Sequence, residues 1–316
     1  MTTRSLVHPE LDAFLDEFPA FTVSAETLPL IRQGVLPASP DDLLGTDVVV
    51  EDRRIAGPTG APEVRVLVYH PAEASTPLPG LLWIHGGGYV LGSADADDLL
   101  VRDFVSKVGC MAVSVDYRLA PETPFPGPVE DCYAALTWMH AHAEELGLDA
   151  GRIAIGGASA GGGLAAGLGL LARDRGEVPL AFQLLIYPML DDRTVTHPDP
   201  HPHVGEFVWT RESNQFGWQS LLGHEPGLDA VSPYAAAARA EHLAGLPPTY
   251  INVGTLDLFL EEDLEYARRL MRAGVPTELH VYPGAYHGFN RFKSASVTQS
   301  FDRDMIAALR RGLGQP

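Results

Sequence analysis

Residues 152–161 read RIAIGGASAG, and this stretch decides the fold. Its first five residues have the apolar composition of a buried strand, and the run GLAAGLGLLARD at 163–174 has that of a helix. Between them, residues 157–161 form a G-x-S-x-G pattern around Ser159. A sharp strand-to-helix turn of this kind lifts the serine hydroxyl above the sheet and places it at a helix N-terminus. The stretch therefore predicts that Ser159 is a nucleophile.

Two other interpretations of these glycines stay open, and a third is excluded. Gly161, Gly163 and Ala166 loosely fit the dinucleotide-binding pattern G-x-G-x-x-A, but they begin beyond the turn itself. A phosphate-binding P-loop needs a lysine after its glycines, and none follows here. A tight turn with an idle serine would carry no chemistry.

The chain around this stretch alternates apolar runs with helical patterns. The runs lie at 81–85, 111–117, 152–156, 181–187, 248–254 and 278–284, and the helical patterns lie near 95–108, 129–147, 163–174, 260–273 and 298–313. Strands that are apolar throughout are buried on both faces, which indicates a mostly parallel sheet between helix layers. We therefore predict an α/β fold. Period-two alternation at 48–55 and 63–70 predicts two antiparallel edge strands.

Two regions interrupt this rhythm and predict a small helical cap. Residues 10–36 have helical spacing without a preceding strand. Residues 192–226 carry four aromatic residues spaced as if on helices: Phe207, Trp209, Phe216 and Trp218. We expect cap helices within residues 1–45 and a catalytic domain over residues 46–316, into which the second region is inserted.

A run of glycines, Gly86 to Gly88, follows His85 at the end of the first apolar run. Consecutive glycines can turn their backbone N–H groups toward a ligand. We predict that the amides of Gly87, Gly88 and Ala160 form an oxyanion hole, with Gly86 giving the turn its freedom. His85 is expected to fix the loop through backbone hydrogen bonds. Taken alone, the glycines also fit a flexible turn.

A serine hydroxyl needs a base to remove its proton, and the base needs an acid to orient it. His287 is predicted as the base because it lies in a loop just past a predicted strand. Asp257 is predicted as the acid because it directly follows the neighbouring predicted strand, whereas the acidic residues 261–263 fall within the next helix. A loop histidine with a structural role and a carboxylate at a helix start are the alternatives.

Four motifs together resemble the hormone-sensitive lipase family of α/β-hydrolases, which includes the bacterial family IV esterases. They are HGGG at 85–88, DYRLAPE at 116–122, GASAG at 157–161 and HGF at 287–289, and the resemblance covers residues 80–310. It implies the α/β-hydrolase fold with an eight-stranded sheet, and a cap built from the N-terminus and an insertion after the sixth strand. It also implies hydrolysis of carboxylic esters, usually with short acyl chains, without a cofactor or metal.

The same resemblance implies that residues 116–122 support the oxyanion loop. From their types and spacing, Asp116, Arg118 and Glu122 are expected to pair with one another. Two positions depart from the family pattern: Ala158 stands where most relatives carry Asp or Thr, and Leu258-Phe259 follows Asp257 in place of Pro-Leu.

The predicted function is that of a serine carboxylesterase acting on short-to-medium-chain esters. Amide or carbamate hydrolysis by the same three residues is an alternative, and a non-catalytic small-molecule receptor is a weaker one because such proteins typically lose the histidine. Residues expected to contact the substrate are Tyr89, Leu91, Phe207, Trp209 and Trp218.

Composition narrows the choice of partners. The chain carries 22 Lys and Arg against 41 Asp and Glu, a net charge of −19, which argues against nucleic acid as a partner. Cys110 and Cys132 are expected to be buried thiols in a reducing compartment, and we predict a cytoplasmic protein with a homodimer as its candidate assembly. The histidines at 197, 201 and 203 alternate with prolines and favour a solvated loop over a metal site.

Overall fold

A computed structural model describes residues 2–16, 22–34, 47–73 and 77–315 of the chain. Parts of the predicted N-terminal cap, residues 17–21 and 35–45, lie outside the described residues. Within these ranges, no helix has both the length and the apolar character needed to cross a membrane.

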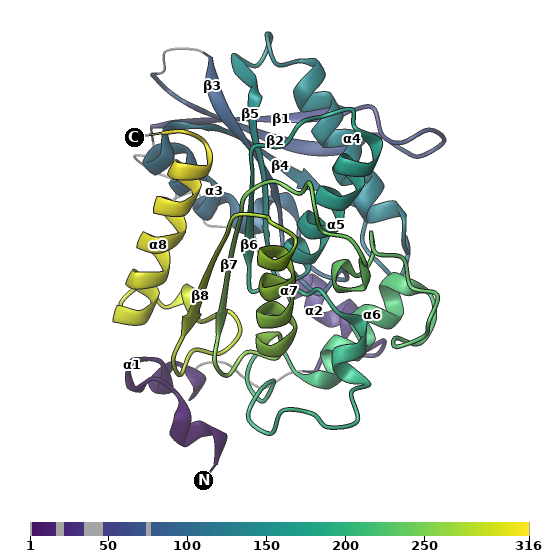
Figure 1. The fold of residues 1–316 in the computed structure, drawn as a ribbon, viewed down its shortest axis with the longest axis vertical. Helices are drawn as coiled ribbons and strands as arrows, with labels where there is room; N and C mark the ends of the chain where they lie inside the picture. Colours follow the sequence, from purple (N-terminus) through teal and green to yellow (C-terminus); the bar gives the residue numbers. More distant parts are fainter. Residues whose placement is uncertain (1, 17–21, 35–46, 74–76, 316) are drawn as a thin grey trace.

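One sheet of eight strands forms the centre of the molecule (Figure 1), in the order β1-β2-β4-β3-β5-β6-β7-β8. The strands are β1 (Val48–Ile55), β2 (Val64–Pro71), β3 (Leu78–Ile84), β4 (Met111–Asp116), β5 (Leu148–Ala158), β6 (Phe182–Ile186), β7 (Thr249–Gly254) and β8 (Thr277–Tyr282). Neighbours from β4 to β8 run parallel, and β1 and β2 pair antiparallel. The predicted α/β fold is confirmed. One detail was wrong: of the two predicted antiparallel edge strands, only β1 lies at an edge of the sheet, because β2 also pairs antiparallel with β4.

Helices cover both faces of the sheet. The α-helices are α1 (Pro9–Asp12), α2 (Leu28–Gly34), α3 (Asp98–Phe104), α4 (Gly127–Ala141), α5 (Ala160–Arg175), α6 (Arg211–Leu222), α7 (Leu260–Arg272) and α8 (Ser296–Gly312). Buried side chains of α4, α5 and α7 belong to one apolar cluster, and those of α3 and α8 to another (Figure 1). Two cores on opposite faces explain why the central strands are apolar throughout.

The remaining helical segments of the described residues are 3₁₀ turns, apart from one π turn at Val105–Gly109. The 3₁₀ turns lie at Thr3–Leu6, Ala13–Asp16, Ala94–Asp97, Asp192–Val195, Ala237–Arg239 and Phe289–Arg291.

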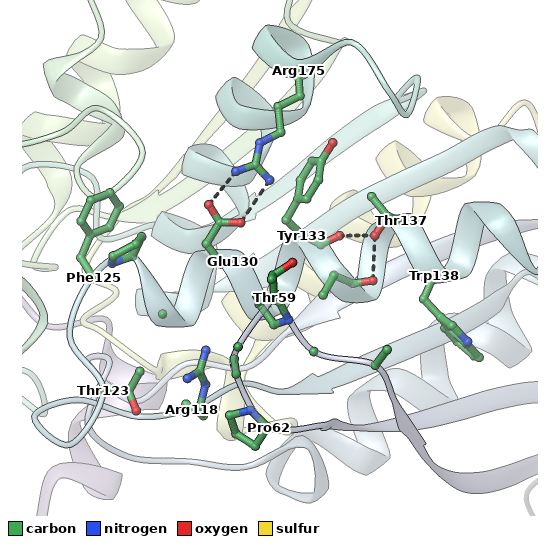
Figure 2. Close-up of a pocket in the computed structure, with 18 of the residues that line it drawn as sticks. Thr59, Pro62, Arg118, Thr123, Phe125, Glu130, Tyr133, Thr137, Trp138 and Arg175 are labelled. Atoms are coloured by element: carbon green, nitrogen blue, oxygen red, sulfur yellow. Dashed lines mark hydrogen bonds and ion pairs between the residues drawn. The ribbon is translucent and has the colours of Figure 1, made fainter.

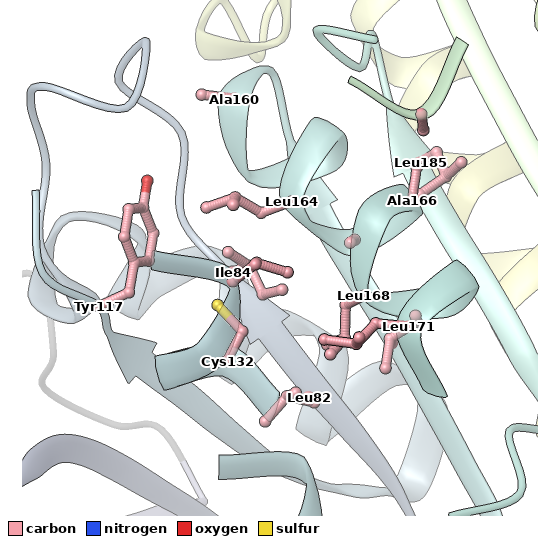
Figure 3. Packing of buried hydrophobic residues seen from close by; sticks show 14 of the residues in the cluster. Leu82, Ile84, Tyr117, Cys132, Ala160, Leu164, Ala166, Leu168, Leu171 and Leu185 are labelled. Atoms are coloured by element: carbon pink, nitrogen blue, oxygen red, sulfur yellow. The ribbon is translucent and has the colours of Figure 1, made fainter. Parts of the chain in front are cut away.

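The core beneath Ser159 is apolar and closely packed. Figure 3 shows Leu82 and Ile84 of β3 facing Leu164 and Leu168 of α5, with Cys132 of α4 beside them. Each of these side chains is at most 2% exposed, and burying a leucine stabilises a fold by roughly 1.5–3 kcal/mol. This packing fixes the start of α5 against the end of the sheet. Both cysteines of the chain are free and buried, as predicted.

The two N-terminal helices, α1 and α2, pack against different parts of the molecule. Arg32 of α2 donates to the carbonyls of Val90 and Ala120, and the amide of Val23 donates to Ser213 in α6. By contrast, α1 packs on the loop after β8, where the Tyr286 hydroxyl donates a hydrogen bond to the carbonyl of Leu11. The two N-terminal helices therefore contact different parts of the molecule, and their assignment to the cap stays a prediction.

Candidate active site

Ser159 occupies the sharp turn between β5 and α5, with a backbone φ of +58°. Two glycines make this turn possible. A Cβ on Gly157 would lie 2.3 Å from the carbonyl oxygen of Gly161, and a Cβ on Gly161 would lie 2.0 Å from that of Ile84. The serine amide donates to Ile186 at the end of β6. The hydroxyl is thereby held above the carboxyl edge of the sheet, at the N-terminus of α5.

His287 and Asp257 complete a hydrogen-bonded row with this serine. The Nε2 atom of His287 lies 3.0 Å from Ser159 Oγ, and Nδ1 lies 2.8 Å from Asp257 Oδ2. Since an ionised carboxylate only accepts, Nδ1 carries the ring proton and Nε2 is free to accept the serine proton. All three residues are buried, with Asp257 fully enclosed. The arrangement can move a proton from the hydroxyl to the imidazole.

The second carboxylate oxygen of Asp257 is also satisfied, because it accepts from the backbone amide of Phe259 at 3.0 Å. Asp257 and His287 come from loops after β7 and β8, which are adjacent in the sheet. Parallel neighbours end at the same edge, so chain segments far apart in sequence meet there.

The glycine loop lies beside the serine. A Cβ on Gly86 would come 3.4 Å from Ser159 Cβ, and Gly87 and Gly88 adopt φ values of +116° and +61°. The backbone N–H groups of Gly87, Gly88 and Ala160 donate no hydrogen bond to any residue in the part of the chain that the structure describes. Three free N–H groups near one hydroxyl can stabilise an oxyanion, each being worth roughly 3 kcal/mol.

His85 and Tyr117 hold this loop from behind. The hydroxyl of Tyr117 donates to the His85 carbonyl, and the two rings stack with centroids 4.2 Å apart. The His85 Nδ1 atom lies 2.8 Å from the Gly86 carbonyl, and burial lowers the pKa of this imidazole. In addition, Ala120 donates from its amide to Tyr89. The segment 116–122 therefore supports the oxyanion loop, as the resemblance implied.

The predicted ion pairing within this segment was wrong. Arg118 pairs with Asp131 of α4, which is fully buried, and Glu122 pairs with Arg32 of α2. Asp116 accepts from a backbone amide and lies 3.7 Å from Arg65. Each partner comes from an element that packs on the segment, and sequence spacing does not reveal such neighbours.

The aromatic residues of the cap insertion divide into two groups. Phe216 and Trp218 lie on α6, whereas Phe207 and Trp209 lie in the loop before it, not on a helix as expected. Trp218 and Tyr89 have no exposed surface and pack on each other with ring centroids 5.2 Å apart. They support the cap from inside and offer no surface to a substrate.

The residues predicted to contact substrate that do keep some exposed surface are Leu91, Phe207 and Trp209. Of these, Trp209 has a ring contact with the hydrogen-bonded row of Ser159, His287 and Asp257: its ring centroid lies 6.4 Å from that of His287. The histidine loop 197–203 forms local contacts, such as the one between the His197 ring and the carbonyl of Asp199.

Two aromatic neighbours of His287 escaped the sequence analysis. The ring of Tyr187 lies 4.7 Å from the imidazole, and the ring of Phe259 meets it edge-on at 5.2 Å. Tyr187 directly follows β6, so its place at the carboxyl edge of the sheet was a usable signal. Phe259 is one of the two departures from the family pattern. Leu258, the first residue of that same departing pair, lies against Gly205 of the cap insertion, where an added Cβ would come 2.8 Å from Leu258 Cδ1.

A separate groove of about 1110 Å³ lies between the β1–β2 turn and α4 (Figure 2). Arg175 there pairs with Glu130 and lies 4.2 Å over the ring of Tyr133. Its lining residues do not include Ser159, Asp257 or His287.

Comparison with known proteins now decides the family. A family model described as the alpha/beta hydrolase fold matches residues 81–291. This chain belongs to that family, in its hormone-sensitive lipase branch.

Several proteins similar to this chain are named as esterases or ester hydrolases. The carboxylesterase NlhH of Mycobacterium tuberculosis is 34% identical, with 99% of each chain covered. A solved structure named bacterial heroin esterase is 43% identical, with a TM-score of 0.91 and 99% of each chain covered. The ethyl acetate hydrolase of Pseudomonas putida is 31% identical over 76% of this chain and 75% of its own. The predicted enzyme class, a carboxylic ester hydrolase, is confirmed.

Proposed function

We propose that this enzyme hydrolyses carboxylic esters with short acyl groups by acyl transfer through Ser159. The observation that carries the proposal is the hydrogen-bonded row of Ser159, His287 and Asp257 beside three free backbone amides. The name of one relative, ethyl acetate hydrolase, supports a small acyl group.

In the first half of the reaction, Ser159 Oγ attacks the ester carbonyl carbon while His287 Nε2 accepts the hydroxyl proton. The negative charge on the carbonyl oxygen is held by the amides of Gly87, Gly88 and Ala160. Asp257 stabilises the imidazolium and keeps its Nδ1 proton in place. The bond to the alcohol then breaks, and the alcohol leaves with the proton from Nε2.

In the second half, a water molecule gives its proton to His287 and attacks the acyl-enzyme carbonyl. Collapse of that intermediate breaks the bond to Ser159 Oγ, and the serine recovers its proton from His287. The products are a carboxylic acid and an alcohol. Only protein groups and water take part, so the proposed reaction uses no cofactor or metal.

The test is a series of p-nitrophenyl esters from acetate to decanoate, measured on the wild type and on Ser159→Ala. We expect the wild type to prefer the short esters and Ser159→Ala to lose roughly 10⁴-fold or more of kcat/KM. Ser294→Ala, which changes an exposed serine, serves as the matched control. Retention of more than about one part in a hundred by Ser159→Ala would disprove the nucleophile.

The cytoplasmic location and the homodimer stay predictions from the sequence. Gel filtration at several protein concentrations would test the second of these.

A further inference from the structure

Residues 207–209, which we name the cap strap, lie between the loop that carries His287 and the glycine loop at 86–88. Their backbone is strained at Val208. The amide of Trp209 donates to the carbonyl of Phe207 at 2.7 Å, which closes a γ-turn around Val208. The φ of Val208 is +61°, the sign of the rarer, strained form of this turn. For a β-branched residue such an angle is an outlier. Strain of this kind persists where surrounding contacts enforce it, and it often marks a functional site.

The first two strap residues rest on the loop that carries His287. The ring of Phe207 packs on Tyr286 with centroids 5.8 Å apart, and Val208 Cγ1 would lie 3.8 Å from a Cβ on Gly288. The third strap residue, Trp209, reaches the glycine loop on the other side of Ser159 and His287. A Cβ on Gly88 would lie only 2.1 Å from Cη2 of Trp209, so the six-membered ring lies directly against the oxyanion loop.

Trp209 is held in this position by α6. Its Nε1 atom donates to Oδ1 of Asn214 at 3.0 Å, and Asn214 is fully buried. One turn further along α6, a Cβ on Gly217 would lie 2.7 Å from the carbonyl oxygen of Gly88. The helix therefore sits on the oxyanion loop itself. The indole cannot swing away without breaking a buried hydrogen bond.

We propose that Trp209 is a specificity-determining residue that limits the length of the acyl chain. This inference rests on the proposed ester hydrolysis. The leaving alcohol must lie within about 3 Å of His287 Nε2 to receive its proton. The Trp209 ring lies 6.4 Å from the His287 ring between centroids, but it lies directly against Gly88, whose amide is proposed to hold the carbonyl oxygen. The group that stays on the carbonyl carbon extends along that loop and meets the indole.

The experiment compares kcat/KM for p-nitrophenyl decanoate with that for p-nitrophenyl acetate in Trp209→Ala and Trp209→Leu. Each additional methylene that a pocket accommodates is worth about fourfold in binding. We therefore expect Trp209→Ala to raise the decanoate-to-acetate ratio at least about tenfold, with Trp209→Leu in between. An unchanged ratio in both variants overturns the proposal.

A second ratio separates the acyl side from the alcohol side of the ester. We expect the ratio of 1-naphthyl acetate to p-nitrophenyl acetate to stay as in the wild type, and a larger shift here than in the acyl ratio overturns the acyl assignment. Trp138→Ala is the matched control, because Trp138 lines the separate groove of Figure 2, and neither ratio should change in it. Thermal melts exclude variants that do not fold. A wild type without turnover of any of these esters would refute the proposed function itself, not this inference.

Discussion

The end of β7 and the first turns of α7 each bury carboxyl groups, but they treat these groups differently. Asp257, at the end of the strand, has hydrogen-bond donors on both oxygens. Asp263, in the helix, is equally buried, yet both of its oxygens lack a partner among the described residues. Glu262, next to Asp263 in the helix, does have donors on both oxygens: it accepts from the backbone amides of Leu190 and Asp191 and from the Thr194 hydroxyl.

The difference teaches that burial alone does not make a carboxyl group functional. Burial raises the pKa of Asp263 well above its usual range, and the nearby Glu262 and Asp257 carboxyls raise it further. Burial also raises the pKa of Glu262, although the hydrogen bond from Thr194 opposes this. Only Asp257 is aligned with a base, so only there can a negative charge act in the proposed reaction.

The largest expected effect comes from Asp257→Asn. An amide in this place would favour the wrong tautomer of His287, so kcat/KM for p-nitrophenyl acetate should fall by roughly 10⁴-fold. The midpoint temperature of thermal unfolding should stay close to that of the wild type, because asparagine has nearly the same shape as aspartate. A variant with near wild-type kcat/KM would remove Asp257 from the catalytic row.

A smaller, purely structural effect is expected for Glu262→Ala. The change leaves the buried amides of Leu190 and Asp191 without their acceptor, which should lower the free energy of unfolding by about 3 kcal/mol. Chemical denaturation with urea measures it. An unchanged free energy would mean that water replaces the carboxylate at no cost.

Asp263→Asn should act in the opposite direction and raise stability. A carboxyl whose pKa is raised on folding favours the folded state below its unfolded pKa and costs stability as the pH rises toward the folded pKa. The variant should therefore gain about 1–2 kcal/mol of unfolding free energy at pH 8, and less at pH 4. Denaturation at the two pH values tests this, and a gain that is larger at pH 4 would contradict the raised pKa.

The smallest effect is expected for Glu262→Gln. Burial raises the pKa of Glu262, which favours a neutral side chain here, and a glutamine keeps one oxygen that can accept from the amides of Leu190 and Asp191. The free energy of unfolding should change by less than about 1 kcal/mol near pH 7. A loss as large as that of Glu262→Ala would instead show that the folded protein needs the ionised form.

Much of the fold and of the candidate site follows from local sequence patterns. The strand-to-helix turn at Ser159 is visible because small residues flank the serine on both sides. Asp257 and His287 are each found directly after an apolar run, and parallel strands bring such positions to one edge. Other features escaped prediction: the true partners of Arg118 and Glu122, the separate docking of α1, and the strained turn at Val208.

The sequence by itself thus predicted the mostly parallel sheet, the alternation of strands and helices along the chain, and the three side chains that meet in one hydrogen-bonded row. These depend on periodicity and on chain positions immediately after strands, which are local properties. The tertiary structure alone decided which charges pair, which aromatic residues are buried inside the cap, and that Trp209 lies against Gly88. Those contacts join segments far apart in the chain, and their geometry depends on how whole elements pack.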